Sequence, residues 1–225
     1  MRCYHFLKAD MTAGSGNEPA WTVGETRTHN GPVKLCESDY HASATELDAL
    51  QYAPRSDAPM LCEVEVEPVE RDDESSPGQK MVSATRTLLS ARNVERELRL
   101  FACDCAERAL RREREAGHEP DPRSWNAITV ARRFAAGEAT AEELAAADAA
   151  ARADAAAWAA AWAAAAARAA ADAAAWAAAW AAADAAAAAW ATARDGRDGR
   201  NAEIDWQRTR LHEILSAVPT PEVTE

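Results

Sequence analysis

The sequence lacks a long uncharged apolar run. A membrane-spanning helix needs roughly 18 or more consecutive apolar residues. The most apolar part of the chain is an alanine- and tryptophan-rich segment, and its longest uncharged stretch, between Asp154 and Arg168, is 13 residues. Because alanine is also only weakly apolar, we predict no membrane span.

An export signal is also missing. The apolar run at the N-terminus is too short and too interrupted to form the core of a signal peptide. The chain has only five cysteines, at Cys3, Cys36, Cys62, Cys103 and Cys105. An odd number of scattered cysteines without an export signal indicates free thiols in a reducing compartment. We therefore expect a soluble, cytoplasmic protein.

Motifs that carry chemistry are absent as well. The sequence has no P-loop, no GxGxxG and no GxSxG, and its five histidines form no HExxH spacing. Cys103 and Cys105 fall in a predicted helix, where residues two apart point about 200° away from each other and cannot chelate one metal. We predict no catalytic residue, no cofactor and no metal site, which favours a protein that is not an enzyme.

The charge balance is acidic. The formal net charge is −12 and the pI is about 4.9. An acidic chain repels nucleic-acid phosphates and gains nothing at an anionic membrane surface. We expect neither nucleic acid nor membrane as a partner.

What is present divides the chain in two. Residues 1 to about 90 hold most of the glycine, proline, threonine, valine and cysteine, whereas the segment from about 138 to 195 is mostly alanine. This shift predicts an α+β fold by segregation, with an antiparallel strand-rich domain followed by an all-α domain with long alanine-rich helices. The predicted limits are 1–92 for the strand-rich domain, 93–217 for the helical domain and 218–225 for a disordered tail.

The strand-rich domain has one unambiguous strand. From Cys62 to Glu67 apolar and acidic residues alternate, which predicts a strand over 60–67 with one buried and one solvated face. Thr45 is a predicted cap for a short helix that ends near Tyr52. The other strands are predicted at 2–8, around 23–26, at 33–36 and, as the partner of 60–67, at 80–89.

From Asn93 the periodicity becomes helical. Asn93 is a predicted N-cap for a helix to about 116, and Asp121-Pro122 begins a second helix to about 136. Thr140 to Glu143 is a capping box that opens the alanine-rich segment. Gly196 and Gly199 predict a loop, after which Asn201 caps a last helix.

The alanine-rich segment 141–195 is predicted to be helical throughout, because alanine has the highest helix propensity. One continuous helix of that length would measure about 80 Å, so a break or a fold-back within it stays open. At 3.6 residues per turn, five tryptophans fall on one stripe about 80° wide. They are Trp158, Trp162, Trp176, Trp180 and Trp190.

This tryptophan stripe must be covered, since each indole can bury about 150–250 Å². Packing within the helical domain would cover it, and so would a dedicated partner groove or a second copy of the chain. A protein partner and a homo-oligomer are therefore both open.

Residues 23–52 resemble the middle of ADP-ribosyltransferase domains. In such domains a Val-Gly-Asp turn precedes a strand that ends in small hydroxyl residues, followed by a helix with a late aromatic; here these are Val23-Gly24-Glu25, the strand through His41 to Ser43, and Tyr52. The resemblance implies that Ser43 helps to hold the nicotinamide ribose and that Arg2 or His5 reaches NAD. No Glu-x-Glu catalytic turn is found, because Glu65 and Glu67 lie on a predicted strand.

About residues 1–90 also resemble an uncharacterised domain found near the start of phage and bacterial proteins. The resemblance is carried by Val23-Gly24-Glu25-Thr26, by Leu35 to Ala42, where Asp39-Tyr40-His41-Ala42 replaces Gly-Phe-His-Ala, and by Tyr52-Ala53-Pro54. It implies no known activity.

The stretch from about 98 to 216 is similar to a helical family of immunity proteins of bacterial toxin systems. The similarity is carried by Phe101 to Leu110, by Ala131 to Thr140, by the alanine/tryptophan run and by Asp205-Trp206-Gln207 with Leu211. Such proteins bind and block a toxin domain. The first hypothesis is therefore a non-enzymatic binding protein. The second is an NAD-binding enzyme related to ADP-ribosyltransferases, active or degenerate, and a structural or scaffold component is the third.

Overall fold

The computed structural model divides the chain into two compact units. It describes residues 1–14, 18–31, 33, 40–54, 58–67, 70–71, 80–152 and 196–218. The sheet unit comprises Met1–Val94 with the C-terminal residues from Ser216, and the helical unit comprises Glu95–Leu215. The mixed α+β class predicted from the sequence is confirmed.

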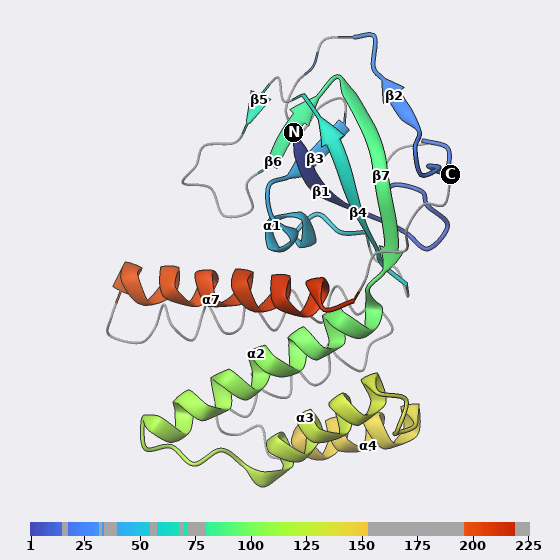
Figure 1. The fold of residues 1–225 in the computed structure, drawn as a ribbon. Coiled ribbons are helices and arrows are strands. Elements are labelled where there is room, and N and C mark those ends of the chain that lie inside the picture. The colour runs from blue at the N-terminus through green and yellow to red at the C-terminus, as the bar shows by residue number, and fades with distance from the viewer. Residues whose placement is uncertain are drawn as a thin grey trace. The chain divides into compact units, whose positions relative to one another are not determined.

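The sheet unit is built on one antiparallel sheet of seven strands (Figure 1). Their order across the sheet is β2-β7-β4-β1-β3-β6-β5, so β1 and β4 lie near its middle. The strands are β1 (Arg2–Leu7), β2 (Thr26–Thr28), β3 (Tyr40–Ser43), β4 (Met60–Val66), β5 (Glu70–Arg71), β6 (Lys80–Ser83) and β7 (Thr85–Asn93).

The alternating strand predicted at 60–67 is β4, and its alternation decides which face is buried. Cys62, Val64 and Val66 are all at most 1% exposed and belong to one apolar cluster with residues of β1 and β7. On the opposite face Glu65 is exposed, whereas Glu63 is half-buried opposite Tyr4 of β1.

The predicted partner strand over 80–89 is in fact two strands. β6 pairs with β3, whereas β7 pairs with β4, and the chain changes partner at Ala84. The break follows from a local hydrogen bond, because the Ser83 hydroxyl accepts from the Thr85 backbone N–H at 3.2 Å. Serine side chains compete in this way with the ladder of a sheet. The predicted strand at 33–36 falls mostly outside the described residues.

Helix α1 (Glu46–Leu50) begins where its cap was predicted. Thr45 has extended backbone angles and its side chain accepts from the Asp48 backbone N–H at 3.2 Å. All five residues of the helix are buried.

The helical unit contains α2 (Glu95–Glu115), α3 (Pro122–Ala135), α4 (Ala141–Arg152) and α7 (Gly196–Ser216). The predicted cap at Asn93 is wrong, because Asn93 is the last residue of β7 and pairs with Met60. The caps at Asp121 and Thr140 are confirmed. Asp121 accepts from the Arg123 backbone N–H at 2.7 Å, and Thr140 exchanges both bonds of its capping box with Glu143.

Two glycines follow the ends of helices, close to the helix limits predicted from the sequence. Gly117 and Gly137 follow α2 and α3 and have φ values of +88° and +77°, which favour glycine. The predicted loop at Gly196 and Gly199 is wrong, because α7 begins at Gly196 and runs through both. Gly196 and Gly199 therefore keep helical geometry despite glycine's low helix propensity.

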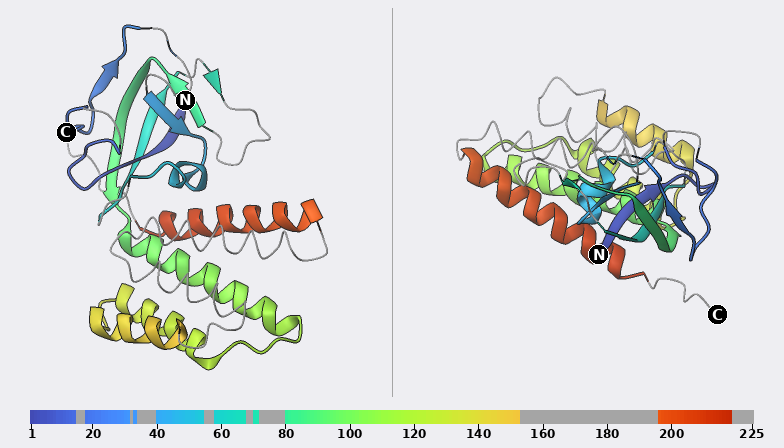
Figure 2. Two further views of the ribbon diagram at one scale, coloured as in Figure 1. Left: turned by 180° about the vertical axis from the view of Figure 1, so that it is seen from behind. Right: turned by 90° about the horizontal axis from the view of Figure 1, so that it is seen from above.

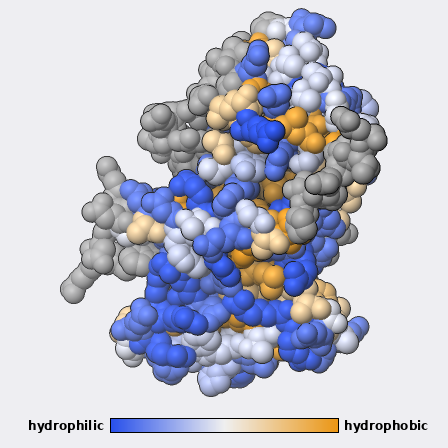
Figure 3. Space-filling model, viewed as in Figure 1, coloured by the Kyte–Doolittle hydropathy of each residue, from blue (hydrophilic) through white to orange (hydrophobic). Residues whose placement is uncertain are grey.

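Within the helical unit α2 is the central helix. It packs against α3, and α3 packs against α4. Figures 1 and 2 show α7 running beside α2, in agreement with the ion pairs that join them. On the face seen in Figure 3 the surface of this unit is mostly hydrophilic.

Among the described residues no helix is both long enough and apolar enough to cross a bilayer. The part of the alanine-rich segment beyond Arg152 lies outside the described residues, and so do the five tryptophans of the stripe. The continuity of the predicted helix 141–195 therefore stays a prediction.

Candidate functional site

The two faces of the sheet carry different polar groups. Alternate residues of a strand point to opposite faces, and residues paired directly across strands share a face. Ser43 is paired with Tyr4 on one side and with Lys80 on the other. We call this the Ser43 face, and the opposite one, which carries His5, Tyr40, Cys62 and Arg86, the Arg86 face.

The Ser43 face brings together the three residues singled out in the N-terminal sequence. His41 and Ser43 are two positions apart on β3 and share this face. The ammonium group of Lys80, directly across from Ser43, lies 4.7 Å from the centroid of the Tyr52 ring. Ser43 is 2% exposed, His41 is half-buried and Tyr52 is 44% exposed.

On this face Tyr4 lies beside the carboxylates of Glu46 and Glu63. Burial raises the pKa of Tyr4 to about 12, and the charge of Glu46, its hydrogen bond with Tyr4 and the charge of Glu63 add to the effect. Glu46 is held there by the first turn of α1 and is 6% exposed. At neutral pH Tyr4 is therefore protonated and donates its hydroxyl hydrogen to Glu46.

Ser43 lies between Tyr4, which is next to these carboxylates, and the cation of Lys80. Its neighbour on β1 is Tyr4 and its neighbour on β6 is Lys80. The residue is only 2% exposed, so its hydroxyl is held in the interior of this face. A buried hydroxyl can exchange hydrogen bonds with a polar group placed beside it.

Of the two residues that the resemblance offered for reaching NAD, Arg2 or His5, only Arg2 lies on the Ser43 face. His5 follows Tyr4 on β1, so it points to the Arg86 face, away from Ser43. Arg2 shares the Ser43 face by the same alternation and is exposed. Glu65 is exposed opposite Arg2, on a strand and not in a catalytic turn.

The Arg86 face holds a cation–aromatic cluster that the sequence analysis missed. Arg86 on β7 is 3% exposed, and its guanidinium carbon lies 4.4 Å from the ring centroid of Trp21 and 5.0 Å from that of Tyr40. The two rings meet edge-to-face at 5.5 Å. A second guanidinium, from Arg27, lies 4.0 Å from the Trp21 ring centroid.

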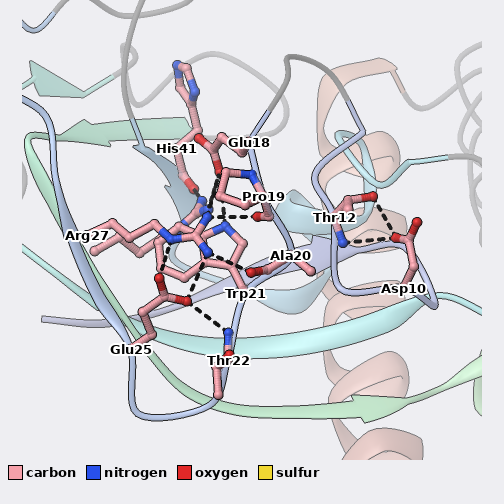
Figure 4. Close-up of polar contacts among 11 residues, drawn as sticks. Asp10, Thr12, Glu18, Pro19, Ala20, Trp21, Thr22, Glu25, Arg27 and His41 are labelled. Carbon is pink, nitrogen blue, oxygen red and sulfur yellow. Dashed lines mark hydrogen bonds and ion pairs between the residues drawn. The ribbon is translucent and has the colours of Figure 1, made fainter.

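Hydrogen bonds fix this cluster (Figure 4). Arg86 donates to the backbone oxygen of His41 at 3.1 Å, while the His41 side chain points away from the cluster. Trp21 donates its indole N–H to Glu18 at 3.0 Å, and Glu18 lies 3.8 Å from Arg86. Arg27 is held by Glu25 at 2.6 Å and donates to the backbone oxygens of two residues of the same loop, Pro19 and Ala20.

Arg86 is a strongly desolvated cation. Burial lowers its pKa to about 10, against the opposing attraction of Glu18. Arg86 remains charged at neutral pH, and among the described residues it has the hydrogen bond to His41 and the carboxylate of Glu18 just beyond hydrogen-bond length. The sequence contains one indication that Arg86 is buried. Arg86 and Leu88 are two positions apart on β7, so their side chains share a face, and Leu88 is buried.

The helical unit has a set of ion pairs that includes one completely buried carboxylate, Glu203. Glu203 on α7 is 0% exposed and lies 3.1 Å from Arg108 and 2.5 Å from Arg112, both on α2. Asp104 of α2 pairs with Arg132 of α3 at 2.7 Å and with Arg210 of α7 at 2.6 Å. These pairs join three helices through one side of α2.

The cysteines in the described part are buried free thiols. Burial raises the pKa of Cys62 and Cys103 to about 12, and it raises the pKa of Cys105 well above the usual value. A buried thiol in this state is a poor nucleophile. Across the described ranges, no group of histidine, cysteine and carboxylate side chains is arranged to hold a metal ion.

The comparisons with known proteins bear on the sheet unit. Residues 1–99 match a family model described as a domain of unknown function, DUF7666. This confirms the resemblance to an uncharacterised domain and extends it slightly past β7. No curated protein and no solved structure matches the chain.

Proposed function

We propose that this protein is a non-enzymatic binding protein whose helical unit recognises a protein partner. The similarity to immunity proteins makes a toxin domain the partner class. The observation that carries the proposal is the network around Asp104 and Glu203. It joins the residues on which that similarity rests.

The network supports a recognition role because it makes the helices rigid. Asp104 and Arg108 come from the Phe101–Leu110 stretch, and Arg132 comes from the stretch that begins at Ala131. On α7, Gln207 donates to the buried Glu203 at 3.2 Å. Helices fixed in this way lose little conformational entropy when a partner binds, which favours affinity.

The state of the thiols supports a non-enzymatic role. A catalytic cysteine needs a pKa near or below neutrality and access to a substrate. Cys103 is 2% exposed and Cys105 is 0% exposed, and burial raises the pKa of both thiols. Cys103 and Cys105 therefore serve to pack α2 inside the helical unit. The charged outer faces of the helices remain for contact with a partner.

The acidic charge favours a basic partner. Complementary charge speeds association and selects the partner, and it weakens with salt. The chain has lysine only at Lys8, Lys34 and Lys80, so residues 95–225 carry none. A carbodiimide, which couples carboxylates to amines, can join this part of the chain to a partner only through its own carboxylates and the partner's lysines.

That chemistry gives the test. The full-length protein is used to capture partners from native lysate, the complex is coupled with carbodiimide, and the linked peptides are identified by mass spectrometry. We expect links from carboxylates within residues 95–218 and capture that declines between low and high salt. Links confined to residues 1–94 would contradict the proposal.

The second candidate function is binding of NAD or a related ribose-containing molecule at the Ser43 face. It is favoured by the position of Ser43, which is buried between Tyr4 and Lys80 in the sheet. A ribose could hydrogen-bond to the Ser43 hydroxyl, and Lys80 could meet a phosphate.

Calorimetry with the full-length protein tests this second function. We expect NAD to release heat with the natural chain and with the control Thr28→Val, whose position on the edge strand β2 is remote from β3 in the sheet. Ser43→Val should abolish the heat. The absence of heat at millimolar NAD with the natural chain excludes NAD binding.

A further inference from the structure

His5 lies in the middle of the sheet, and one of its ring nitrogens has no hydrogen-bond partner in the described part of the chain. Its strand, β1, runs between β4 and β3, and His5 is paired directly with Cys62. The Nε2 atom of His5 is buried and has no hydrogen-bond partner among the described residues. Protonation would create a buried N–H⁺ group with nothing to accept its hydrogen.

The other charges on this face make that protonation still harder. Arg86 on β7 is already a buried cation, and Arg27 adds a second guanidinium against Trp21. The carboxylates near them are Glu18, 3.8 Å from Arg86, and Glu25, which is bound to Arg27. The remaining titratable groups near His5 are the thiols of Cys3 and Cys62, the phenol of Tyr40 and the imidazole of His41, whose charge also opposes protonation of His5.

The segment 18–28 covers this face and is attached mainly along the edge of the sheet, where the Thr26 and Thr28 hydroxyls bond to those of Thr87 and Thr85, while the Trp21 backbone N–H donates to Met11. Trp21 packs on Arg86, and β2 contributes only the pairs of Thr26, Arg27 and Thr28 with β7 at the edge of the sheet. Two further backbone bonds join Gly24 and Glu25 to Leu88. Short edge strands are the first parts of a sheet to open.

We propose that His5 and Arg86 form an acid-sensitive switch, in which protonation of His5 releases the segment 18–28 from the sheet. The released segment uncovers Arg86, which then meets solvent. The switch acts in the sheet unit and does not depend on the function proposed for the helical unit.

The pH window follows from the histidine. Burial, then the charges of Arg86 and His41, hold the pKa of His5 well below its usual value of 6.5. The open form has the usual value and therefore binds the proton first as the pH falls. Opening is thus favoured below pH 6.5, by up to about tenfold per pH unit while the closed form stays unprotonated.

Hydrogen–deuterium exchange of the full-length protein, corrected for the intrinsic rate at each pH, tests the switch. We expect the protection of peptides covering 18–28 to fall about tenfold between pH 6.5 and 5.5. His5→Leu should keep the same protection at both pH values. The matched control is His118→Gln, because the side chain of His118 is 76% exposed and lies in the helical unit; it should behave as the natural chain.

Equal protection of 18–28 at both pH values in the natural chain overturns the proposal, and so does an unchanged loss in His5→Leu. Should that variant fail to fold, nuclear magnetic resonance of the natural chain decides instead. The imidazole of His5 must stay neutral in the closed form at pH 6, and titration of His5 in the closed form at 6.5 or above overturns the switch.

Discussion

The carboxylate of Glu203 lies 3.1 Å from the Nε of Arg108, a residue 95 positions earlier in the chain, and Glu203 is completely buried. A carboxylate is stable in such a place only if cations and donors surround it. Arg112 and Gln207 complete that environment. Glu203 and Asp104 are thus two acidic side chains that join α2 to α7, and of the two Glu203 is the completely buried one.

Replacing Glu203 should destabilise the helical unit. Glu203→Ala removes the partner of two arginines, and we expect a loss of about 3 kcal/mol, at the lower end for buried pairs because both arginines reach solvent. Urea unfolding followed by far-ultraviolet circular dichroism measures it. Asp205→Asn is the control, since the Asp205 side chain is 72% exposed, and should change stability by less than about 0.5 kcal/mol.

The buried thiols should resist alkylation. At pH 8 a thiol with a pKa near 12 is ionised about a thousandfold less than one with a pKa near 9. A short pulse of iodoacetamide, followed by peptide mass spectrometry, should leave Cys62, Cys103 and Cys105 unmodified in the native protein and modify all three in urea. Native alkylation of Cys103 or Cys105 at the rate found in urea would contradict the buried geometry of α2.

Tyr4 should make the sheet unit sensitive to alkali. Its pKa is raised to about 12 in the folded protein, whereas an unfolded tyrosine has a pKa of about 10. Between these values the unfolded chain has lost the proton and the folded chain has kept it, so stability falls as the pH rises above 10. Tyr4→Phe should remove this slope. Absorbance at 295 nm should show one tyrosine fewer titrating near pH 12.

Arg86 should contribute to stability through its hydrogen bond to His41 and its contacts with the rings of Trp21 and Tyr40. Arg86→Met keeps much of the volume but leaves the backbone oxygen of His41 without its donor, and we expect a loss of about 1–3 kcal/mol. Exchange protection of β3 and β7 peptides measures the loss. Arg2→Met, at an exposed position, should leave that protection unchanged. Full protection in Arg86→Met would show that apolar packing is sufficient there.

Capping and alternation patterns correctly predicted those helices and strands whose formation depends on residues close together in the sequence. Thr45, Asp121 and Thr140 each cap a helix as expected, because an N-cap needs only one side chain and a backbone N–H two or three positions away. The strand at 60–67 was equally clear, since burial of one face imposes the alternation. The predicted cap at Asn93 failed because pairing with Met60 extends β7 to that residue.

The sequence predicted only part of the candidate site. His41, Ser43 and Tyr52 were singled out from the sequence, but Lys80 and Tyr4 join them only because β6 and β1 flank β3. The resemblance offered Arg2 or His5 as the residue that reaches NAD, and the alternation along β1 puts only Arg2 on the face of Ser43.

The sequence by itself determined the division into a strand-rich and a helical part, most helix starts and the acidic charge, because composition, periodicity and capping act over a few residues. Only the tertiary structure decided that Arg86 is buried against Trp21 and that Glu203 meets Arg108. Both contacts join residues more than 60 positions apart. Whether a charge far from its partner is solvated or buried depends on which strands and helices become neighbours, and no local pattern records that.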